Sequence, residues 1–305
     1  MINFKKVEIQ DKDWVDPLLK AADFGGCHYN FTNLFAWVNI YCYRIAQMEN
    51  HLVVKGTITN ELDEAISYYF YPAGKGDPQG VLAEMKKDAD DSGHPFVLYG
   101  LSHENVAVLN RIYPEKFEFK ERRDSFDYVY LLEKLVTLSG KKLAAKRNHI
   151  NRFKENNDWS FEPITMENIG ECWEMNVKWC HINGCLEDEH LSDEYCAVRR
   201  CFKYFWELGL EGGLIRANGR VVAFTMGSQL NSNTYDIHVE KAYGEIQGAY
   251  QMINREFAAL IQKKYPHILY VNREEDMGYP GLRKAKLSYK PEKFEVKISA
   301  KYIYE

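Results

Sequence analysis

Apolar residues in the second half of the chain recur first at helical spacing and then at alternate positions. This pattern predicts a fixed order of elements. They are a strand at 159–164, helices at 166–181 and 192–208, strands at 212–217, 221–229 and 234–239, a helix at 248–264 and a strand at 267–271. Asn218-Gly219 marks a two-residue hairpin turn after the first of the three central strands, and residues 231–233 close the next hairpin.

The first half of the chain alternates between shorter strands and helices. Helices are expected at 11–22, 79–90 and 104–113, and strands at 41–46, 51–55, 66–71, 96–99 and 126–132. Such alternation predicts an α/β fold of the α+β kind, with mixed sheets. A polar stretch at 156–158 separates a basic segment from a new strand, so we expect two lobes, 1–157 and 158–305.

Composition restricts the class of protein. The apolar fraction of 46% and the aromatic fraction of 14% predict a folded chain rather than a disordered one. A formal net charge of -5 argues against a basic protein that coats nucleic acid. The N-terminus has no apolar leader pattern, and no stretch reaches the ~18 apolar residues of a membrane span. We therefore expect a cytoplasmic protein.

The cysteine pattern points to reduced thiols. Seven cysteines, an odd number, are scattered along the chain, as expected for a protein of a reducing compartment. Cys180, His181, Cys185 and His190 lie close in sequence, but their spacing matches none of the usual zinc patterns. No metal is expected.

A glycine-containing loop at 241–250 joins the last central strand to the following helix. This loop and the order of elements resemble GNAT-type N-acetyltransferases, in which a helix N-terminus binds the pyrophosphate of coenzyme A. The resemblance implies two tandem GNAT-like lobes, with the working cleft in the C-terminal one. It makes Lys241, Gly244, Gln247 and Gly248 candidate phosphate-binding residues. The superfamily pattern places its Gln or Arg three residues before the first glycine, so this loop is related to the pattern without matching it.

Three further stretches are more specific. They read YNFTNLFAW at 29–37, SGKKLAAKRNHINRF at 139–153 and NREEDMGYPGLRKAKLSYKP at 272–291. Together they resemble the family typified by the cytosolic C-terminal domain of phosphatidylglycerol lysyltransferases, which is related to the Fem-type peptidoglycan transferases. The resemblance implies direct attack of an acceptor (a lipid head group, a peptide or a small amine) on an aminoacyl-tRNA. Contact with a membrane surface would then be peripheral.

The second of these stretches predicts a basic helix over 139–155, with Ser139 as its N-cap. Lys146 and Arg147 lie close to its apolar stripe of Leu143 and Ile150, which favours a helix that lines a cleft and binds phosphate. The alternative is a solvated basic face whose lysine stems cover apolar surface.

The third stretch follows the strand at 267–271, at the end where α/β folds bind ligands. Asn272, Glu274, Glu275 and Asp276 could position an amine acceptor or act as a base, and Glu275 or Asp276 is the best candidate to take the proton. The basic residues Arg283, Lys284 and Lys286 could hold phosphate or carboxylate. The alternative is an acidic turn followed by a basic surface helix.

The strand at 234–240 is expected to carry polar side chains on one face and apolar side chains on the other. Thr234, Asp236, His238 and Glu240 alternate with apolar residues. Such a face suggests the wall of a cleft, in which His238 could act as a general base because imidazole titrates near neutral pH. A structural histidine is the alternative.

Three functions remain open at this point. The first is aminoacyl transfer from aminoacyl-tRNA, and it is supported by the resemblance of the three stretches. The second is an N-acetyltransferase that uses acyl-CoA as donor and a small amine as acceptor, and it depends on the loop at Gly244. The third is a module without catalysis that binds RNA or another anion.

Overall fold

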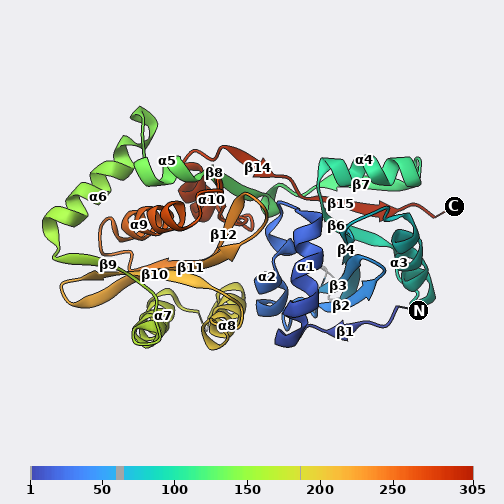
Figure 1. Ribbon diagram of the computed structural model, residues 1–305, viewed down its shortest axis with the longest axis horizontal. Helices are drawn as coiled ribbons and strands as arrows, with labels where there is room; N and C mark the ends of the chain where they lie inside the picture. Colours follow the sequence, from blue (N-terminus) through green and yellow to red (C-terminus); the bar gives the residue numbers. More distant parts are fainter. Residues whose placement is uncertain (1, 60–64, 186, 305) are drawn as a thin grey trace. The chain divides into compact units, whose positions relative to one another are not determined.

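The structure is a computed structural model that describes residues 2–59, 65–185 and 187–304, and its contacts divide the chain into two compact units (Figure 1). Unit 1 comprises Met1–Asp127, Glu275–Gly278 and Phe294–Glu305, and unit 2 comprises Tyr128–Glu274 and Tyr279–Lys293. The boundary expected at 157/158 lies inside unit 2, between a helix and the strand that follows it. It stays a prediction of where two acyltransferase-like lobes meet.

Unit 1 contains an eight-stranded sheet in the order β1-β2-β3-β4-β6-β15-β7, with β5 paired to β3. Its strands are β1 Lys5–Lys6, β2 Arg44–Met48, β3 His51–Thr59, β4 Ala65–Phe70, β5 Ala73–Gly74, β6 Val97–Leu101, β7 Phe117–Glu121 and β15 Ile298–Tyr302. Its helices are α1 Lys12–Ala22, α2 Phe31–Ala36, α3 Gln79–Asp91 and α4 His103–Ile112. Strands β4 and β6 are parallel, and the C-terminal β15 lies between β6 and β7.

Helix α2 comes from the first of the three family-like stretches. The Asn30 side chain accepts a hydrogen bond from the Thr32 amide and caps the helix, and all six residues of α2 are buried. This part of the stretch therefore serves the core of unit 1.

Unit 2 contains a seven-stranded sheet in the order β14-β8-β13-β12-β11-β10-β9. Its strands are β8 Asp127–Leu131, β9 Trp159–Pro163, β10 Glu211–Ala217, β11 Arg220–Gln229, β12 Thr234–Ala242, β13 Tyr270–Asn272 and β14 Lys293–Glu295. Its helices are α5 Leu132–Thr137, α6 Ala144–Asn156, α7 Ile169–Asn183, α8 Glu189–Lys203, α9 Ala249–Lys264 and α10 Pro280–Leu287. In Figure 1, α7 and α8 cover one face of this sheet and α9 covers the other. The mixed α/β class and the order of elements after β9 are confirmed.

Local sequence explains much of unit 2. Asn218 and Gly219 both have positive φ, 50° and 81°, as a two-residue turn between β10 and β11 requires. On α9 the predicted apolar face is buried at Ile253, Phe257 and Ile261. The antiparallel meander β10–β12 and its covering helix therefore form as expected.

The expected helix over 139–155 begins later than Ser139, so the N-cap assignment is wrong. A 3₁₀ turn occupies Lys141–Leu143, and α6 starts at Ala144. Gly140 has a φ of 87° and turns the chain after α5. Among the described residues, no helix combines the length and apolar character needed to cross a membrane.

Candidate functional site

A β-bulge in β12 determines which way its side chains point. Ile237 pairs with Gly227 and Val239 pairs with Met226, so His238 is the extra residue in this strand. Alternation of the two faces is therefore interrupted at His238. The expectation of a single polar face from Thr234 to Glu240 is wrong for this reason.

The two residues after the bulge show the consequence. Glu240 points toward α9, where its carboxylate accepts a hydrogen bond from Asn254 Nδ2 at 3.0 Å. Lys241 points to the opposite face, and its ammonium lies 3.7 Å from the centre of the Trp179 ring of α7. Strand β12 thus offers polar groups to both faces of the sheet.

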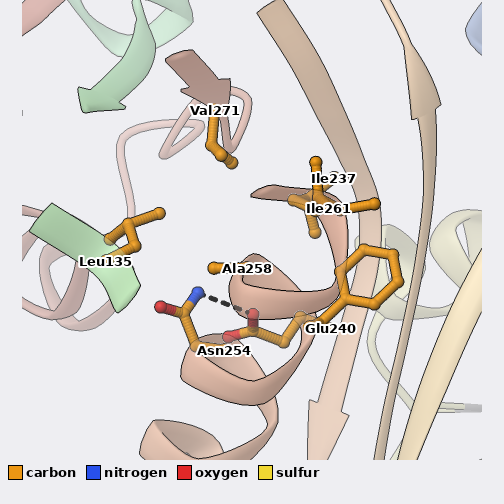
Figure 2. A pocket seen from close by; sticks show the side chains of 8 residues that line it. Leu135, Ile237, Glu240, Asn254, Ala258, Ile261 and Val271 are labelled. Atoms are coloured by element: carbon orange, nitrogen blue, oxygen red, sulfur yellow. Dashed lines mark hydrogen bonds between the residues drawn. The ribbon is translucent and has the colours of Figure 1, made fainter. Parts of the chain in front are cut away.

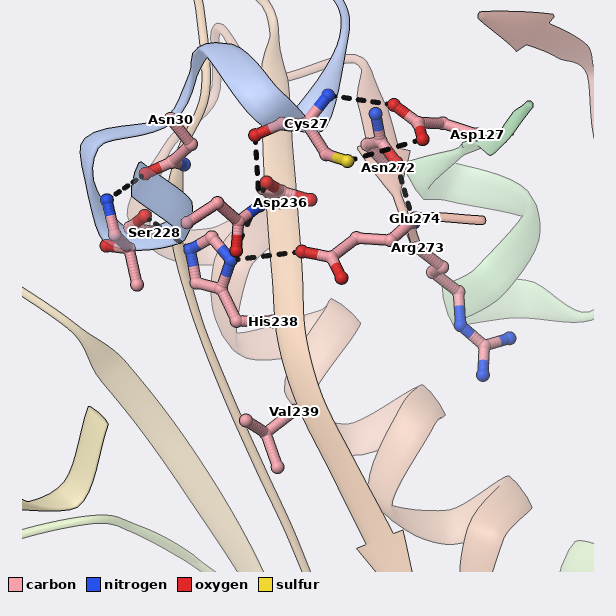
Figure 3. A network of polar contacts seen from close by, with 12 residues as sticks. Cys27, Asn30, Asp127, Ser228, Asp236, His238, Val239, Asn272, Arg273 and Glu274 are labelled. Carbon is pink, nitrogen blue, oxygen red and sulfur yellow. Dashed lines mark hydrogen bonds and ion pairs between the residues drawn. The ribbon is translucent and has the colours of Figure 1, made fainter. Parts of the chain in front are cut away.

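His238 is the centre of a buried polar cluster (Figure 3). Its side chain is only 2% exposed, and its Nδ1 lies 3.3 Å from Glu274 Oε1 and 3.6 Å from Asp236 Oδ2. On the other side of the ring, Nε2 lies 2.9 Å from Ser228 Oγ. Two carboxylates at Nδ1 favour the tautomer that carries its hydrogen there, which leaves Nε2 to accept the Ser228 hydroxyl hydrogen.

Glu274 reaches this cluster through an uncommon backbone conformation. Its φ is 57°, in the left-handed region that non-glycine residues seldom occupy. The Asn272 side chain accepts the Glu274 amide hydrogen at 2.7 Å, and Lys286 Nζ donates to the carbonyls of Arg273 and Glu274 at 2.6 and 3.2 Å. The backbone after β13 is therefore held in place from two sides.

Two sets of side chains could each surround a cation. Asp236, His238 and Glu274 offer donor atoms within 4.8 Å of one another, a set of ligands suited to a divalent transition metal. The second set lies in unit 1 and consists of Cys27, Asp127 and Glu275.

In the unit 1 set, the Lys297 ammonium already provides the positive charge. It lies 2.6 Å from Asp127 and 3.0 Å from Glu275, and 3.3 Å from the Cys27 thiol. Burial opposes the charged form, but Asp127, Cys27 and Glu275 outweigh it and hold the pKa of Lys297 well above its usual value. The chemistry of this set therefore fits an internal ion pair better than a metal centre.

Glu275 and Asp276, the two carboxylates expected to take a proton, belong to unit 1, and each already has a hydrogen-bonding or ion-pair partner there. Glu275 pairs with Lys297, and the Cys27 thiol lies 3.4 Å from its Oε2. The Asp276 side chain is fully buried and accepts the Gly278 amide hydrogen at 2.9 Å.

The loop expected to bind phosphate is packed against α6. Gly248 has a φ of 90°, and a Cβ there would lie 2.5 Å from the His149 carbonyl oxygen. Close packing therefore explains a glycine at this position without a ligand. Lys241 is buried and pairs with Glu194 at 2.6 Å, while Gly244 and Gln247 are exposed.

The basic candidates on α6 and α10 have different environments. Arg147 donates to the carbonyls of Leu138 and Gly140, so it holds the turn between α5 and α6. Lys146 lies over the Tyr289 ring, 4.0 Å from its centre. On α10, Lys284 is exposed, Arg283 is half-buried, and the buried Lys286 holds backbone carbonyls.

A small cavity lies on the α9 face of the sheet (Figure 2). Its walls are apolar except for the hydrogen-bonded pair of Glu240 and Asn254. The apolar walls come from Leu135, Ile237, Phe257, Ala258, Ile261 and Val271.

Sequence reasoning missed Ser228, Arg273 and Tyr289 of unit 2, and also Asp127 and Lys297 of unit 1. Ser228 could have been found from the hairpin, because residues 231–233 set a register that pairs it with Asp236. Arg273 and Tyr289 gave no comparable signal, because only tertiary packing brings them beside Lys146.

The model of the family described as phosphatidylglycerol lysyltransferase, C-terminal, matches residues 20–301. A conserved protein of unknown function from Bacteroides thetaiotaomicron VPI-5482 is 41% identical, with 99% of this chain and 100% of that chain covered and a TM-score of 0.92.

More distant structures share the fold alone. L-PGS from Bacillus licheniformis is 17% identical, with coverage of 96% and 92% and a TM-score of 0.65. FemX is 9% identical, with coverage of 99% and 98% and a TM-score of 0.61. A curated relative, an uncharacterized protein of Mycoplasmoides gallisepticum, is 25% identical over 170 residues; the match spans 55% of this chain and only 53% of that protein's length.

Proposed function

Because this chain belongs to the family of the phosphatidylglycerol lysyltransferase C-terminal domain, we propose that it moves an aminoacyl group from aminoacyl-tRNA to an acceptor, with His238 as the base. The family supports aminoacyl transfer and confirms the resemblance drawn from the three stretches. The acetyltransferase and the binding module without catalysis are not favoured. The observation that carries the assignment of the base is the buried imidazole between Ser228 and two carboxylates.

The proposed reaction needs no covalent enzyme intermediate. A lone pair of the acceptor nucleophile attacks the carbonyl carbon of the aminoacyl ester, and the carbon–oxygen bond to the tRNA ribose breaks. The acceptor proton passes through the Ser228 hydroxyl to His238 Nε2 and then to the ribose oxygen that leaves. Glu274 and Asp236 would stabilise the imidazolium while it holds the proton.

The bulge supplies a second element of the proposal. An extra residue in a strand disrupts the ladder of hydrogen bonds and leaves backbone groups without strand partners. We propose that a backbone N–H of β12 at this bulge stabilises the oxyanion that forms during attack.

His238 suits the role of base better than Glu275 or Asp276. Glu275 is paired with the Lys297 ammonium at 3.0 Å, so its carboxylate already has a charged partner. Asp276 is buried in a turn. The imidazole of His238 has the Ser228 hydroxyl at Nε2 and two carboxylates beside Nδ1, an arrangement that suits proton transfer at Nε2.

The proposed aminoacyl-tRNA donor implies a compartment and a set of acceptors to test. Aminoacyl-tRNA is a cytoplasmic substrate, so we place the protein in the cytoplasm. Phosphatidylglycerol is the first acceptor to test, because it is the acceptor in the family's name. Peptides and small amines are the other acceptor classes, and a lipid acceptor would require peripheral contact with a membrane.

The test is a transfer assay with a pool of tRNAs charged with labelled amino acids. The purified chain is mixed with this pool and with vesicles that contain phosphatidylglycerol, a peptide mixture or small amines. His238→Gln should lower the transfer rate at least ~100-fold, the usual scale for loss of a general base. His267→Gln is the matched control, because His267 is an exposed histidine of the same unit. Equal rates in both variants would rule out the assigned base, and no transfer to any acceptor by the wild-type chain would count against the function itself.

A further inference from the structure

A second polar cluster lies on the α9 face of the sheet in unit 2, around Arg273. This residue follows β13, and its Nη2 lies 2.8 Å from Glu240 Oε1. The guanidinium carbon is 4.9 Å from the centre of the Tyr289 ring and 5.6 Å from that of Tyr130. The Arg273 side chain is 13% exposed, so one carboxylate and two aromatic faces hold an almost buried cation.

Lys146 brings a second cation to the same aromatic ring. Its ammonium, which comes from α6, lies 4.0 Å from the centre of the Tyr289 ring. Burial, followed by repulsion from Arg273, lowers the pKa of Lys146 to about 8. Two like charges are thus held together at a cost, with Tyr289 in contact with both.

The charges of this cluster are not balanced. Lys146 and Arg273 contribute two positive charges, and Glu240 contributes one negative charge. Arg273 Nη1 is buried and donates to no acceptor within the residues that the structure describes. A buried donor of this kind requires a partner, and an anion would supply both the missing acceptor and the missing charge.

We propose that Lys146 and Arg273 form an anion subsite that binds a phosphate of the aminoacyl-tRNA donor. This inference rests on the proposed function for the identity of the donor, while the anion chemistry stands on the cluster alone. A phosphate oxygen accepts from Arg273 Nη1 and from the Lys146 ammonium, and both interactions are charge-assisted. The face of Tyr289 keeps the two cations in position before the phosphate arrives.

The subsite links the donor to the chemistry through two adjacent residues. Arg273 belongs to the phosphate cluster and Glu274 belongs to the His238 cluster. A phosphate bound at Arg273 would therefore be held by the residue that directly precedes Glu274 in the chain. Positioning of this kind supplies a large part of catalysis when the donor is already activated.

A nucleic-acid phosphate is favoured over a lipid phosphate by the surroundings of Lys146. Exposed Lys141 and Lys142 lie just before α6, so positive charge continues along the chain away from the cluster. A polyanion of repeated phosphates can use such a series, whereas a lipid offers one phosphate at the membrane surface.

The first experiment measures the binding of deacylated tRNA across a salt series. Lys146→Met should weaken binding about tenfold, the scale of one charge-assisted hydrogen bond, and should reduce the salt slope by about one. Lys154→Met is the matched control: Lys154 also lies on α6 over an aromatic ring, 4.9 Å from the centre of Trp159. Equal tRNA binding by the two variants would overturn the subsite.

The second experiment separates the subsite from the proposed function. Inorganic phosphate should raise the melting temperature of wild type and of Lys154→Met but not of Lys146→Met, and acetate should have a smaller effect. Loss of the phosphate effect only in Lys146→Met supports the anion subsite even if no aminoacyl transfer is detected. If Lys146→Met loses binding to phosphatidylglycerol vesicles and keeps full binding to tRNA, the lipid is the occupant and the proposal is wrong.

Discussion

The Lys286 ammonium donates to the carbonyl oxygen of Arg273 across 2.6 Å, and it also reaches the carbonyl of Glu274. It thereby fixes the backbone of two consecutive residues whose side chains enter different clusters. Arg273 pairs with Glu240, and Glu274 faces His238. A basic residue that resembles a phosphate ligand in the sequence therefore acts as a positioning residue.

Lys286→Met should damage both clusters together. We expect the turnover rate and the tRNA affinity each to fall roughly tenfold, because two charge-assisted hydrogen bonds to the 273–274 backbone are lost. Lys286→Arg should restore part of both, and Lys290→Met, at an exposed position after α10, should change neither. If Lys286→Met lowers only the melting temperature and leaves the turnover rate and the tRNA affinity unchanged, Lys286 has a purely structural role.

Substitution of the neighbouring acids Glu274 and Glu275 should have different effects. Glu274→Gln removes the carboxylate at His238 Nδ1, and we expect the transfer rate to fall about 100-fold with little change in stability. Glu275→Gln breaks the pair with Lys297 in unit 1, so it should chiefly lower the melting temperature. The measurements are single-turnover rates and thermal unfolding of each variant. The reverse pattern would return the role of base to Glu275.

The effect of pH on tRNA binding should report Lys146. Its pKa in the folded protein is lowered to about 8, so the free ammonium loses its proton as pH rises through that value. A phosphate prefers the charged form, and we therefore expect affinity to fall between about pH 8 and pH 10, by up to tenfold per unit. Lys146→Arg stays charged throughout and should give a flat profile. The same profile in wild type and in this variant would assign the titration to another group.

Folding stability should change in the opposite direction over the same range. Between about pH 8 and the usual lysine value of 10.5, the unfolded chain holds a proton on Lys146 that the folded chain has released. The contribution of Lys146 to the free energy of unfolding therefore rises with pH in this window and is constant below it. Alkaline unfolding would weaken tRNA binding and lower stability together. Weaker tRNA binding with greater stability therefore indicates deprotonation of Lys146 instead.

Removal of metals tests the assignment of His238. If the imidazole exchanges protons with Ser228, exhaustive treatment with EDTA should leave the transfer rate unchanged, and Ser228→Ala should lower it. If the rate is lost with EDTA and returns with zinc or manganese, then Asp236, His238 and Glu274 hold a metal that activates the acceptor. Metal content measured on the purified chain gives an independent answer.

The sequence predicted the elements from β9 to β13 because those elements are encoded locally. The hairpin at Asn218-Gly219 and the apolar face of α9 depend only on neighbouring residues. The bulge at His238 could not be predicted, because it depends on how β11 and β12 pair. The place of β15 between β6 and β7 is also a long-range property, since residues far apart in the sequence pair there.

The same distinction explains the candidate site. His238 and Lys146 could be predicted as candidates because their residue types suit a base and a phosphate ligand. Glu274 could be separated from Glu275 only by its backbone, which turns at a positive φ after β13. Lys241 and Arg147 carry the expected charge, but each already has a partner. Lys241 pairs with Glu194, and Arg147 donates a hydrogen bond to the carbonyl of Gly140.

Gly248 offers a final test of the coenzyme A alternative. Its φ of 90° and the His149 oxygen, 2.5 Å from where a Cβ would lie, predict that Gly248→Ala loses about 2 kcal/mol or more of stability. Gly244→Ala should be nearly neutral, because a Cβ there meets nothing within 4 Å. Acetyl-CoA should not raise the melting temperature of wild type or of either variant, since close packing of Gly248 against α6 explains this glycine without a pyrophosphate ligand. A stable Gly248→Ala variant that has lost a measurable response to acetyl-CoA would instead show that the glycine serves a ligand.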